Sequence, residues 1–344
     1  MAWQIIGHSW AIDFLSHGLD AGQIAHAYLF TGPAQIGKTT LAKAFAQALN
    51  CSQQDPPCGQ CASCLKVAKG NHPDVHLIEG EGAGGSIKIE QVRALQREAA
   101  LKPYEGRYRV FILRQADRAT AEAADSLLKT LEEPPSHVVL ILTASHARAM
   151  RPTVISRCQR LDLRPVTDSL LTEALLDRGA PPAEARLLAR LSGGCAGWAL
   201  GAWNDQSILT RRQQNLDQLV ALLTGDRVQR LEAAATLSRD SNAARQTLDL
   251  WMAWWRDLLL FCGSNENHLV HLDRREEFAR LAPQIGLTQS WAALKALEAA
   301  ATHLDANVNT RLALENFLLK LPRPFANNRH AQPFTLETAP GKEF

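Results

Sequence analysis

The stretch that decides the fold runs from His26 to Thr40 and reads HAYLFTGPAQIGKTT. A short apolar run is followed by the pattern G-x-x-x-x-G-K-[ST] and then by a segment with helical periodicity, which is the setting that a phosphate-binding loop requires. Glycine at two positions of the loop allows backbone N–H groups to turn towards phosphate. We therefore predict a nucleotide-binding loop with the contacts Gly32, Pro33, Gly37, Lys38, Thr39 and Thr40.

Two side chains of this loop carry the chemistry that the pattern predicts. Lys38 supplies a positive charge for the outer phosphates, and Thr39 offers a hydroxyl group to magnesium. The loop thus indicates ATP with magnesium as the bound cofactor. A glycine-rich turn that binds no nucleotide is the alternative interpretation.

The apolar runs around this loop predict an α/β domain. Runs without period-two alternation are typical of parallel strands that are covered on both faces. The predicted strands are 26–30, 74–78, 109–113 and 138–143. Segments with helical periodicity lie between them, at 38–50, 89–101 and 120–131. The alternation predicts a parallel sheet with helices on both sides.

The end of the strand 110–113 argues against hydrolysis by this chain alone. An enzyme that hydrolyses ATP at such a loop needs an acidic residue there to hold magnesium, and commonly a second one to activate water. Arg114 and Gln115 occupy these positions. Arginine cannot bind magnesium, and glutamine cannot take a proton from water. Asp117 lies three residues further on, and whether it replaces the missing carboxylate is left open.

A cluster of cysteines follows the predicted helix after the loop. Cys51, Cys58, Cys61 and Cys64 form the spacing C-x6-C-x2-C-x2-C. Four thiolates at this spacing are typical of tetrahedral zinc, and four protein ligands indicate a structural site rather than a catalytic one. The loop 52–63 contains no Lys, Arg or aromatic residue, which disfavours a zinc-dependent nucleic-acid binding module.

The remaining segments define the domain organisation. We predict an α/β nucleotide-binding domain over 1–163 with the zinc module at 51–64, and a small helical lid over 164–205 with helices at 166–176, at 182–191 and from about 197. A helical bundle is expected over 206–322, with Trp251, Trp255 and Trp291 in its core, and a disordered tail over 323–344.

Composition narrows the functional class further. The chain has 344 residues, of which 46% are hydrophobic and 21% are charged, so a folded protein of two or three domains is expected. A net charge of +2 argues against a protein that binds nucleic acid through a large net positive charge. No run of 18 apolar residues occurs, and seven cysteines without a signal peptide indicate reduced thiols. We expect a cytoplasmic protein that does not cross a membrane.

Several strings together resemble the clamp-loader branch of the AAA+ ATPases. They are HAYLFTGP at 26–33, the four-cysteine insertion, LLKTLEEPP at 127–135, SRC at 156–158 and NTRLALE at 309–315. The resemblance spans residues 7 to about 319. It implies a three-domain subunit of a hetero-pentameric ring, with gamma or tau and delta subunits, the sliding clamp and primer-template DNA as partners of a DNA polymerase holoenzyme, which is a nucleotidyltransferase.

The resemblance also assigns roles to single residues. Thr143 matches the polar residue that senses the terminal phosphate, and Arg157 matches the arginine finger that reaches the ATP of a neighbouring subunit. The lid arginine of the hydrolysing subunits falls at Gly197 here. With Arg114 and Gln115 at the strand end, these departures imply the non-hydrolysing member of the ring.

Other interpretations stay open at this stage. An ATP-hydrolysing gamma or tau type subunit is the main alternative function. Arg157 on its own is also compatible with a surface arginine that pairs with Asp162, and Thr143 with a residue that caps the next turn.

Overall fold

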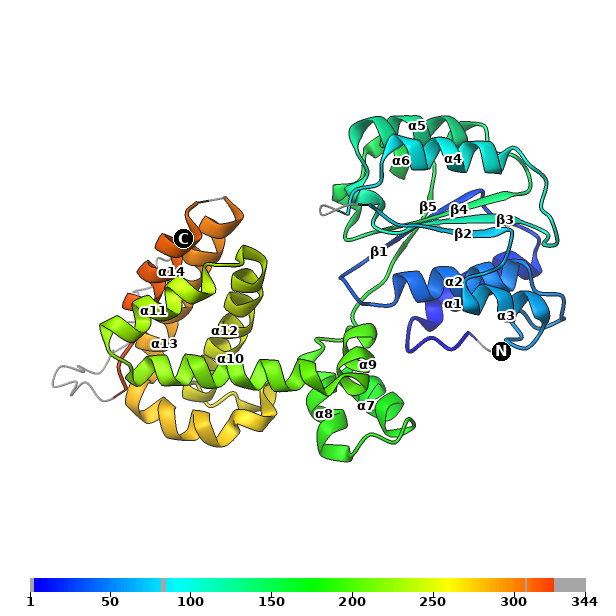
Figure 1. Cartoon of the computed structure of the whole chain (residues 1–344). Coiled ribbons are helices and arrows are strands. Elements are labelled where there is room, and N and C mark those ends of the chain that lie inside the picture. The colour runs from blue at the N-terminus through cyan, green and yellow to red at the C-terminus, as the bar shows by residue number, and fades with distance from the viewer. Residues whose placement is uncertain (1–2, 82–84, 307, 325–344) are drawn as a thin grey trace, which may run out of the picture. The chain divides into compact units, whose positions relative to one another are not determined.

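The computed structural model describes residues 3–81, 85–306 and 308–324 (Figure 1). The chain divides at Asp205 into two units, which are considered one at a time. Unit 1 holds the predicted α/β domain and the lid, and unit 2 holds the predicted bundle. The tail prediction for 323–344 falls almost wholly outside the described residues. Within the described ranges, no helix is long and apolar enough to cross a membrane.

Within the described part of unit 1, five parallel strands form one sheet in the order β2-β3-β4-β1-β5. The strands are β1 (Ala27–Thr31), β2 (Val75–Ile78), β3 (Arg109–Leu113), β4 (Val138–Ala144) and β5 (Gln159–Asp162). The four predicted strands are confirmed to within a residue. β5 was not predicted, because this edge strand has exposed polar residues at Gln159 and Arg160 and no apolar run.

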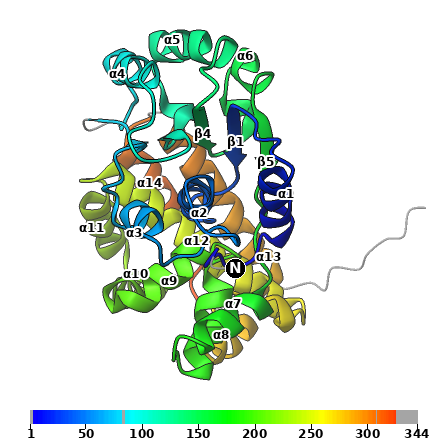
Figure 2. The same ribbon diagram turned by 90° about the vertical axis from the view of Figure 1, so that its right-hand side faces the viewer.

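Helices cover both faces of this sheet, as predicted (Figures 1 and 2). On one face lie α1 (Ser9–Asp20), α2 (Lys38–Leu49) and α3 (Ala62–Lys69), and on the other lie α4 (Ile89–Ala99), α5 (Ala121–Glu132) and α6 (Pro152–Ile155). Successive residues of a strand point to opposite faces. Phe30 therefore packs in the core beside α2, whereas Leu29 packs in the core beside α5.

The lid consists of three short helices that follow Pro165. They are α7 (Asp168–Leu176), α8 (Pro182–Leu191) and α9 (Ala196–Asn204), and all three agree with the prediction. The Thr167 hydroxyl accepts a hydrogen bond from the backbone N–H of Leu170 and so caps α7. Leu171, Ala189 and Ala196 form the buried centre of the lid.

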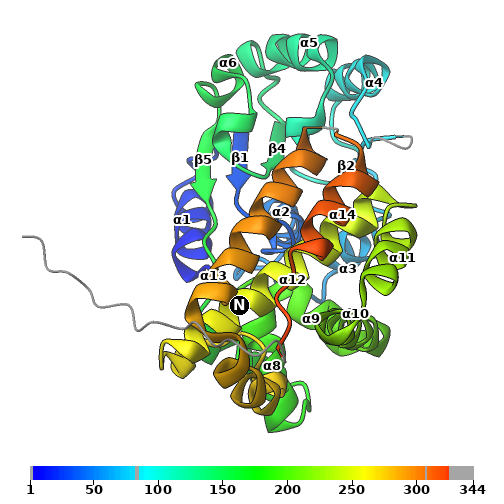
Figure 3. The ribbon, with the colours of Figure 1, turned by 90° about the vertical axis from the view of Figure 1, so that its left-hand side faces the viewer.

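The described residues of unit 2 form helices joined by short turns, without strands, and Figure 3 shows α13 and α14 lying side by side in it. Its helices are α10 (Gln206–Thr224), α11 (Arg227–Leu237), α12 (Ser241–Cys262), α13 (Arg275–Asp305) and α14 (Thr310–Leu319). Trp251, Trp254 and Trp255 are fully buried in its core, which confirms the prediction for Trp251 and Trp255.

The prediction for Trp291 was wrong, because its side chain is 50% exposed. Trp291 and the core residue Leu297 lie on the same helix, but six residues separate them, which is about 120° around a helix. Leu297 is fully buried, so Trp291 lies at the edge of the apolar face. The Lys295 ammonium group lies 5.0 Å from the centre of the indole ring.

Candidate functional site

The phosphate loop lies between β1 and α2, at the carboxyl end of the sheet. Gly37 precedes α2 with a φ of 114°, and Gly32 has a φ of 144°. A Cβ atom at Gly32 would lie 2.6 Å from the Leu163 carbonyl oxygen. The backbone conformation and the close approach therefore require glycine at the first position of the loop.

Lys38 is folded over its own loop. Its Nζ atom donates hydrogen bonds to the carbonyl oxygens of Gly32 and Pro33, both at 2.6 Å. Burial lowers the pKa of Lys38, and the negative charge of Asp117 partly offsets this shift. The ammonium group must turn away from these carbonyl groups to contact a phosphate.

A cavity of about 670 Å³ opens beside the loop. The predicted residues Gly37, Lys38, Thr39, Thr40 and Thr143 line it. Gly32 and Pro33 are not among the lining residues, but their carbonyl groups hold Lys38. The rest of the lining is Ala34, Gln35, Arg114, Gln115, Asp117, Arg118, Ala144, Ser145 and Gly197.

The end of β3 reaches this cavity with the two residues that replace the expected acids. Arg114 forms an ion pair with Glu79 at 2.9 Å, and both side chains are about half exposed. Gln115 takes the left-handed conformation with a φ of 54°. Its backbone N–H donates to the Thr143 hydroxyl oxygen at 3.0 Å. The buried Thr143 thus holds the turn after β3 in place.

The structure brings Asp117 back to the cavity. The 3-10 helix η1 (Ala116–Arg118) turns the chain after β3, and Asp117 Oδ2 accepts hydrogen bonds from the backbone N–H and the hydroxyl group of Ser145 at 3.0 and 2.6 Å. The Ser145 carbonyl oxygen in turn accepts from the Gly32 N–H at 3.2 Å. Asp117 Oδ1 is buried and has no hydrogen-bond partner among the described residues.

The lid also reaches the loop, at a contact that the sequence analysis missed. The backbone N–H of Gly197, in the first turn of α9, donates to the Gln35 carbonyl oxygen at 2.8 Å. The sequence showed only a glycine at this position, where the family resemblance implies an arginine in the hydrolysing subunits. A hydrogen bond between two backbone groups cannot be predicted from the side chains of the two residues.

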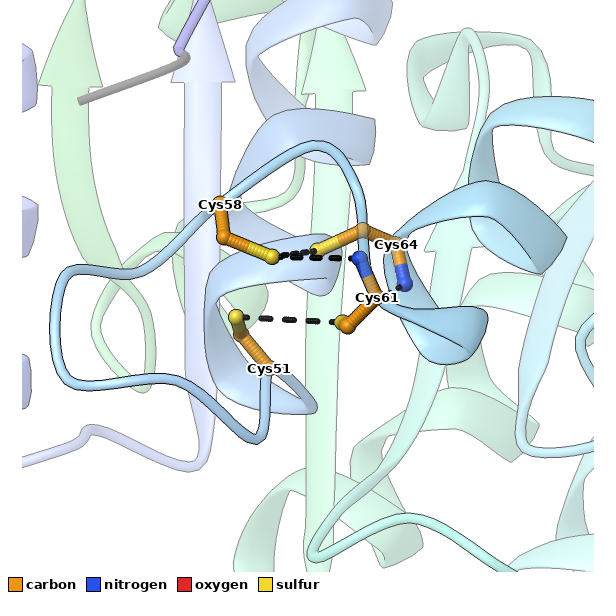
Figure 4. A group of neighbouring side chains, drawn as sticks. All are labelled: Cys51, Cys58, Cys61 and Cys64. Atoms are coloured by element: carbon orange, nitrogen blue, oxygen red, sulfur yellow. Dashed lines mark hydrogen bonds between the residues drawn. The ribbon is translucent and has the colours of Figure 1, made fainter.

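The four predicted cysteines converge on one point (Figure 4). Their sulfur atoms all lie within 4.8 Å of one another, with Cys51 and Cys61 4.0 Å apart and Cys58 and Cys64 3.9 Å apart. Tetrahedral zinc with Zn–S bonds of about 2.3 Å places its ligands about 3.8 Å apart. The spacing of the sulfur atoms therefore fits this ion.

Backbone groups prepare two of these sulfurs for negative charge. Cys58 Sγ accepts from the N–H groups of Gln60 and Cys61 at 3.4 and 3.2 Å, and these bonds lower the pKa of Cys58. Burial opposes ionisation of Cys61, but hydrogen bonds from backbone N–H groups, Cys64 first, lower its pKa to about 6. Thiolates are the form that binds metal.

Arg157 lies apart from the cavity, after α6 and near the end of α5. Its guanidinium group donates to Glu132 Oε1 at 2.8 Å and to the Thr153 carbonyl oxygen at 3.0 Å, and its side chain is 35% exposed. The alternative pairing with Asp162 was wrong. Asp162 instead pairs with Arg160, because both lie on β5.

The parallel sheet, the glycine-rich loop before α2 and the cavity beside Lys38 define a phosphate-loop fold. The sequence model of the family described as "DNA polymerase III, delta subunit" matches residues 7–167. The delta′ subunit of DNA polymerase III from Bacillus subtilis (strain 168) is 29% identical over 310 residues, which cover 89% of this chain and 94% of that protein. Over most of its length the chain is thus similar to a subunit of the DNA polymerase III clamp loader.

Other relatives match over a shorter part of their length. The tau/gamma subunit of Haemophilus influenzae is 32% identical over 228 residues, which cover 65% of this chain and 31% of that protein. The chain thus spans nearly all of the delta′ relative but about a third of the tau/gamma relative. Among solved structures, a gamma subunit-related protein from Thermotoga maritima has a TM-score of 0.45 at 17% identity, covering 90% of this chain and 99% of that one.

Proposed function

We propose that this chain serves as a delta′-type subunit of a DNA polymerase III clamp loader. In this role it does not hydrolyse ATP itself, but assembles with gamma or tau and delta subunits and helps to set the sliding clamp on primer-template DNA in the cytoplasm. The observation that carries the proposal is the end of β3. There Arg114 and Gln115 occupy the edge of the cavity where a hydrolysing subunit needs two acids.

Arg157 is the residue through which we propose that the chain takes part in hydrolysis elsewhere. An arginine supplied across a subunit interface neutralises charge that builds on the transferred phosphoryl group, an effect of roughly a thousandfold to a hundred-thousandfold. The placement of Arg157 outside the cavity supports a role towards another chain. Its pairing with Glu132 is partly exposed, so it is easily exchanged for a stronger anion.

The cysteine cluster completes the proposal as a structural zinc site. Cys51, Cys58, Cys61 and Cys64 would hold the ion, which would tie the end of α2 to α3. The Gln47 side chain on α2 already donates to the Cys64 carbonyl oxygen at 2.8 Å, so metal and protein contacts would hold the same junction. A closed set of four thiolates leaves no ligand position for catalysis.

The test of the proposed function is assembly followed by activity. The full chain should co-purify with the other loader subunits, and Arg157→Ala should leave that assembly intact while it lowers DNA-stimulated ATP hydrolysis by the complex. Arg157→Lys should fail as well, because an ammonium group lacks the planar fork of donors. Unaltered hydrolysis by both variants would contradict the arginine-finger role.

A gamma or tau type ATPase is the second candidate, and the position of Asp117 favours it. Asp117 lines the same cavity as Lys38 and Thr39 and is the one acid among the described lining residues. A steady-state ATPase assay on the isolated chain separates the two candidates. Turnover that Lys38→Ala abolishes would favour the enzyme.

A further inference from the structure

The charges around the nucleotide cavity suit phosphate better than they suit a metal ion. Among the described residues that line the cavity, Lys38, Arg114 and Arg118 are cationic and Asp117 is the one acid. A lining with two more cations than anions attracts phosphate groups and repels a free divalent cation. The cavity therefore favours the nucleotide and disfavours its usual magnesium ion.

The loop itself fits a nucleotide. Gly37 has a positive φ at the start of α2 and lines the cavity together with Lys38. The magnesium ion fits less well. Magnesium at such sites is held by carboxylate oxygens together with the phosphates. The carboxylate position at the strand end is taken by Arg114, whose fixed positive charge opposes the ion.

Asp117 does not restore the missing ligand. Its Oδ2 atom already accepts two hydrogen bonds from Ser145, and these bonds hold the segment that also binds the Gly32 N–H. The Oδ1 atom is buried, which leaves it little access to a hydrated ion. Asp117 is better explained as a residue that positions the loop and balances part of the charge of Lys38.

We propose that this chain binds nucleoside di- or triphosphates without magnesium, with the Arg114 guanidinium group in the place of the metal. Guanidinium carries a permanent charge and binds phosphate oxygens through two parallel N–H donors. Arg114 is half exposed and lines the cavity, whereas its ion-pair partner Glu79 does not. The side chain can therefore exchange Glu79 for phosphate. The proposal rests on the proposed function only in taking the loop as a nucleotide site.

The direct test is calorimetric titration of the full-length chain with ADP and with ATP, in millimolar magnesium and in EDTA. We expect the dissociation constant in EDTA to be the same as that in magnesium or lower. Arg114→Ala should weaken binding about tenfold in EDTA, the effect of losing one charge-assisted hydrogen bond. Arg151→Ala is the matched control, because Arg151 is also a half-exposed arginine in an ion pair but lies outside the cavity.

A variant with the opposite expected effect sharpens the test. Glu79→Gln removes the competing carboxylate of Arg114 and should tighten nucleotide binding severalfold in EDTA. Asp117→Asn addresses the rival explanation, in which that carboxylate holds magnesium. We expect Asp117→Asn to leave the ratio of the dissociation constants in magnesium and in EDTA unchanged.

Three results would overturn the inference. They are binding that requires magnesium and is lost in Asp117→Asn, an affinity that Arg114→Ala leaves unchanged, and the absence of nucleotide binding in both buffers. None of these results would contradict the proposed function as a clamp-loader subunit, because co-purification with the loader subunits tests that function without added nucleotide.

Discussion

The backbone N–H of Gly197 donates a hydrogen bond to the carbonyl oxygen of Gln35 at 2.8 Å, which joins the first turn of α9 to the phosphate loop. A Cβ atom at Gly197 would lie 2.7 Å from the same oxygen. No side chain fits between the two backbones in this arrangement. The arginine that the family resemblance places here in hydrolysing subunits therefore has no room, and glycine allows the lid to contact the loop directly.

Replacement of this glycine should loosen the lid. We expect Gly197→Ala to lower the free energy of unfolding by about 1–3 kcal/mol, because the added methyl group overlaps the Gln35 carbonyl oxygen and breaks the hydrogen bond. Hydrogen exchange should rise in α9 and in the loop together. Gly201→Ala is the control, since a Cβ atom there meets open space in the same helix. Equal effects of the two variants would contradict the contact.

Zinc should be present at about one ion per chain in freshly purified protein. Cys58→Ser and Cys61→Ser should each lose most of it, because structural zinc requires its full set of thiolates. Elemental analysis of the purified variants provides the measurement. Cys262→Ser in unit 2 should keep the metal, and a wild-type chain that contains no zinc would refute the site.

Acid should destabilise unit 1 through Asp74. This carboxylate is fully buried and accepts hydrogen bonds from the backbone N–H groups of Tyr104, Glu105 and Gly106. Burial acts to raise its pKa, but the three N–H groups and the nearby Arg109 guanidinium hold that pKa below its usual value. The folded pKa lies below the unfolded value of about 3.9, so the stabilisation is present above about pH 4 and is lost as pH falls through the folded pKa.

Asp74→Asn should therefore lower the free energy of unfolding by about 3 kcal/mol at pH 7 and make it less sensitive to acid below pH 4. Urea unfolding at several pH values measures both effects. The matched control is Asp13→Asn, which changes an exposed carboxylate on α1. A variant with the wild-type acid dependence would show that Asp74 does not carry the effect.

Ring assembly should depend on unit 2. This unit has its own core and carries exposed apolar side chains, among them Val228, Trp291 and Leu312 at 62%, 50% and 61% exposure. Exposed apolar residues of this size often mark contacts with partner proteins. A chain that ends at residue 205 should lose co-purification with the loader subunits while it keeps its zinc. Assembly as tight as that of the full chain would place the ring contacts in unit 1.

The sequence predicted the elements whose signals are local. Strands β1 to β4 are short apolar runs, and α2, α4 and α5 lie between them with helical periodicity. The helices α1 and α3 escaped prediction. α1 has no side-chain hydrogen bond at its N-terminal cap, and the cap of α3 is a cysteine sulfur, so neither shows the usual start signal. The edge strand β5 also escaped prediction, because it has no apolar run.

Among the site residues, the sequence by itself determined the chemistry available: a lysine and threonines in the loop, an arginine and a glutamine at the end of β3, and four cysteines close enough to meet. Short motifs encode these features because their members are neighbours in the chain. The tertiary structure decided which distant groups meet. It paired Arg157 with Glu132 and not Asp162, turned Asp117 back onto Ser145, and placed Gly197 against Gln35. These contacts depend on strand order and helix packing, which act over more than twenty residues of chain and leave no periodic trace in the sequence.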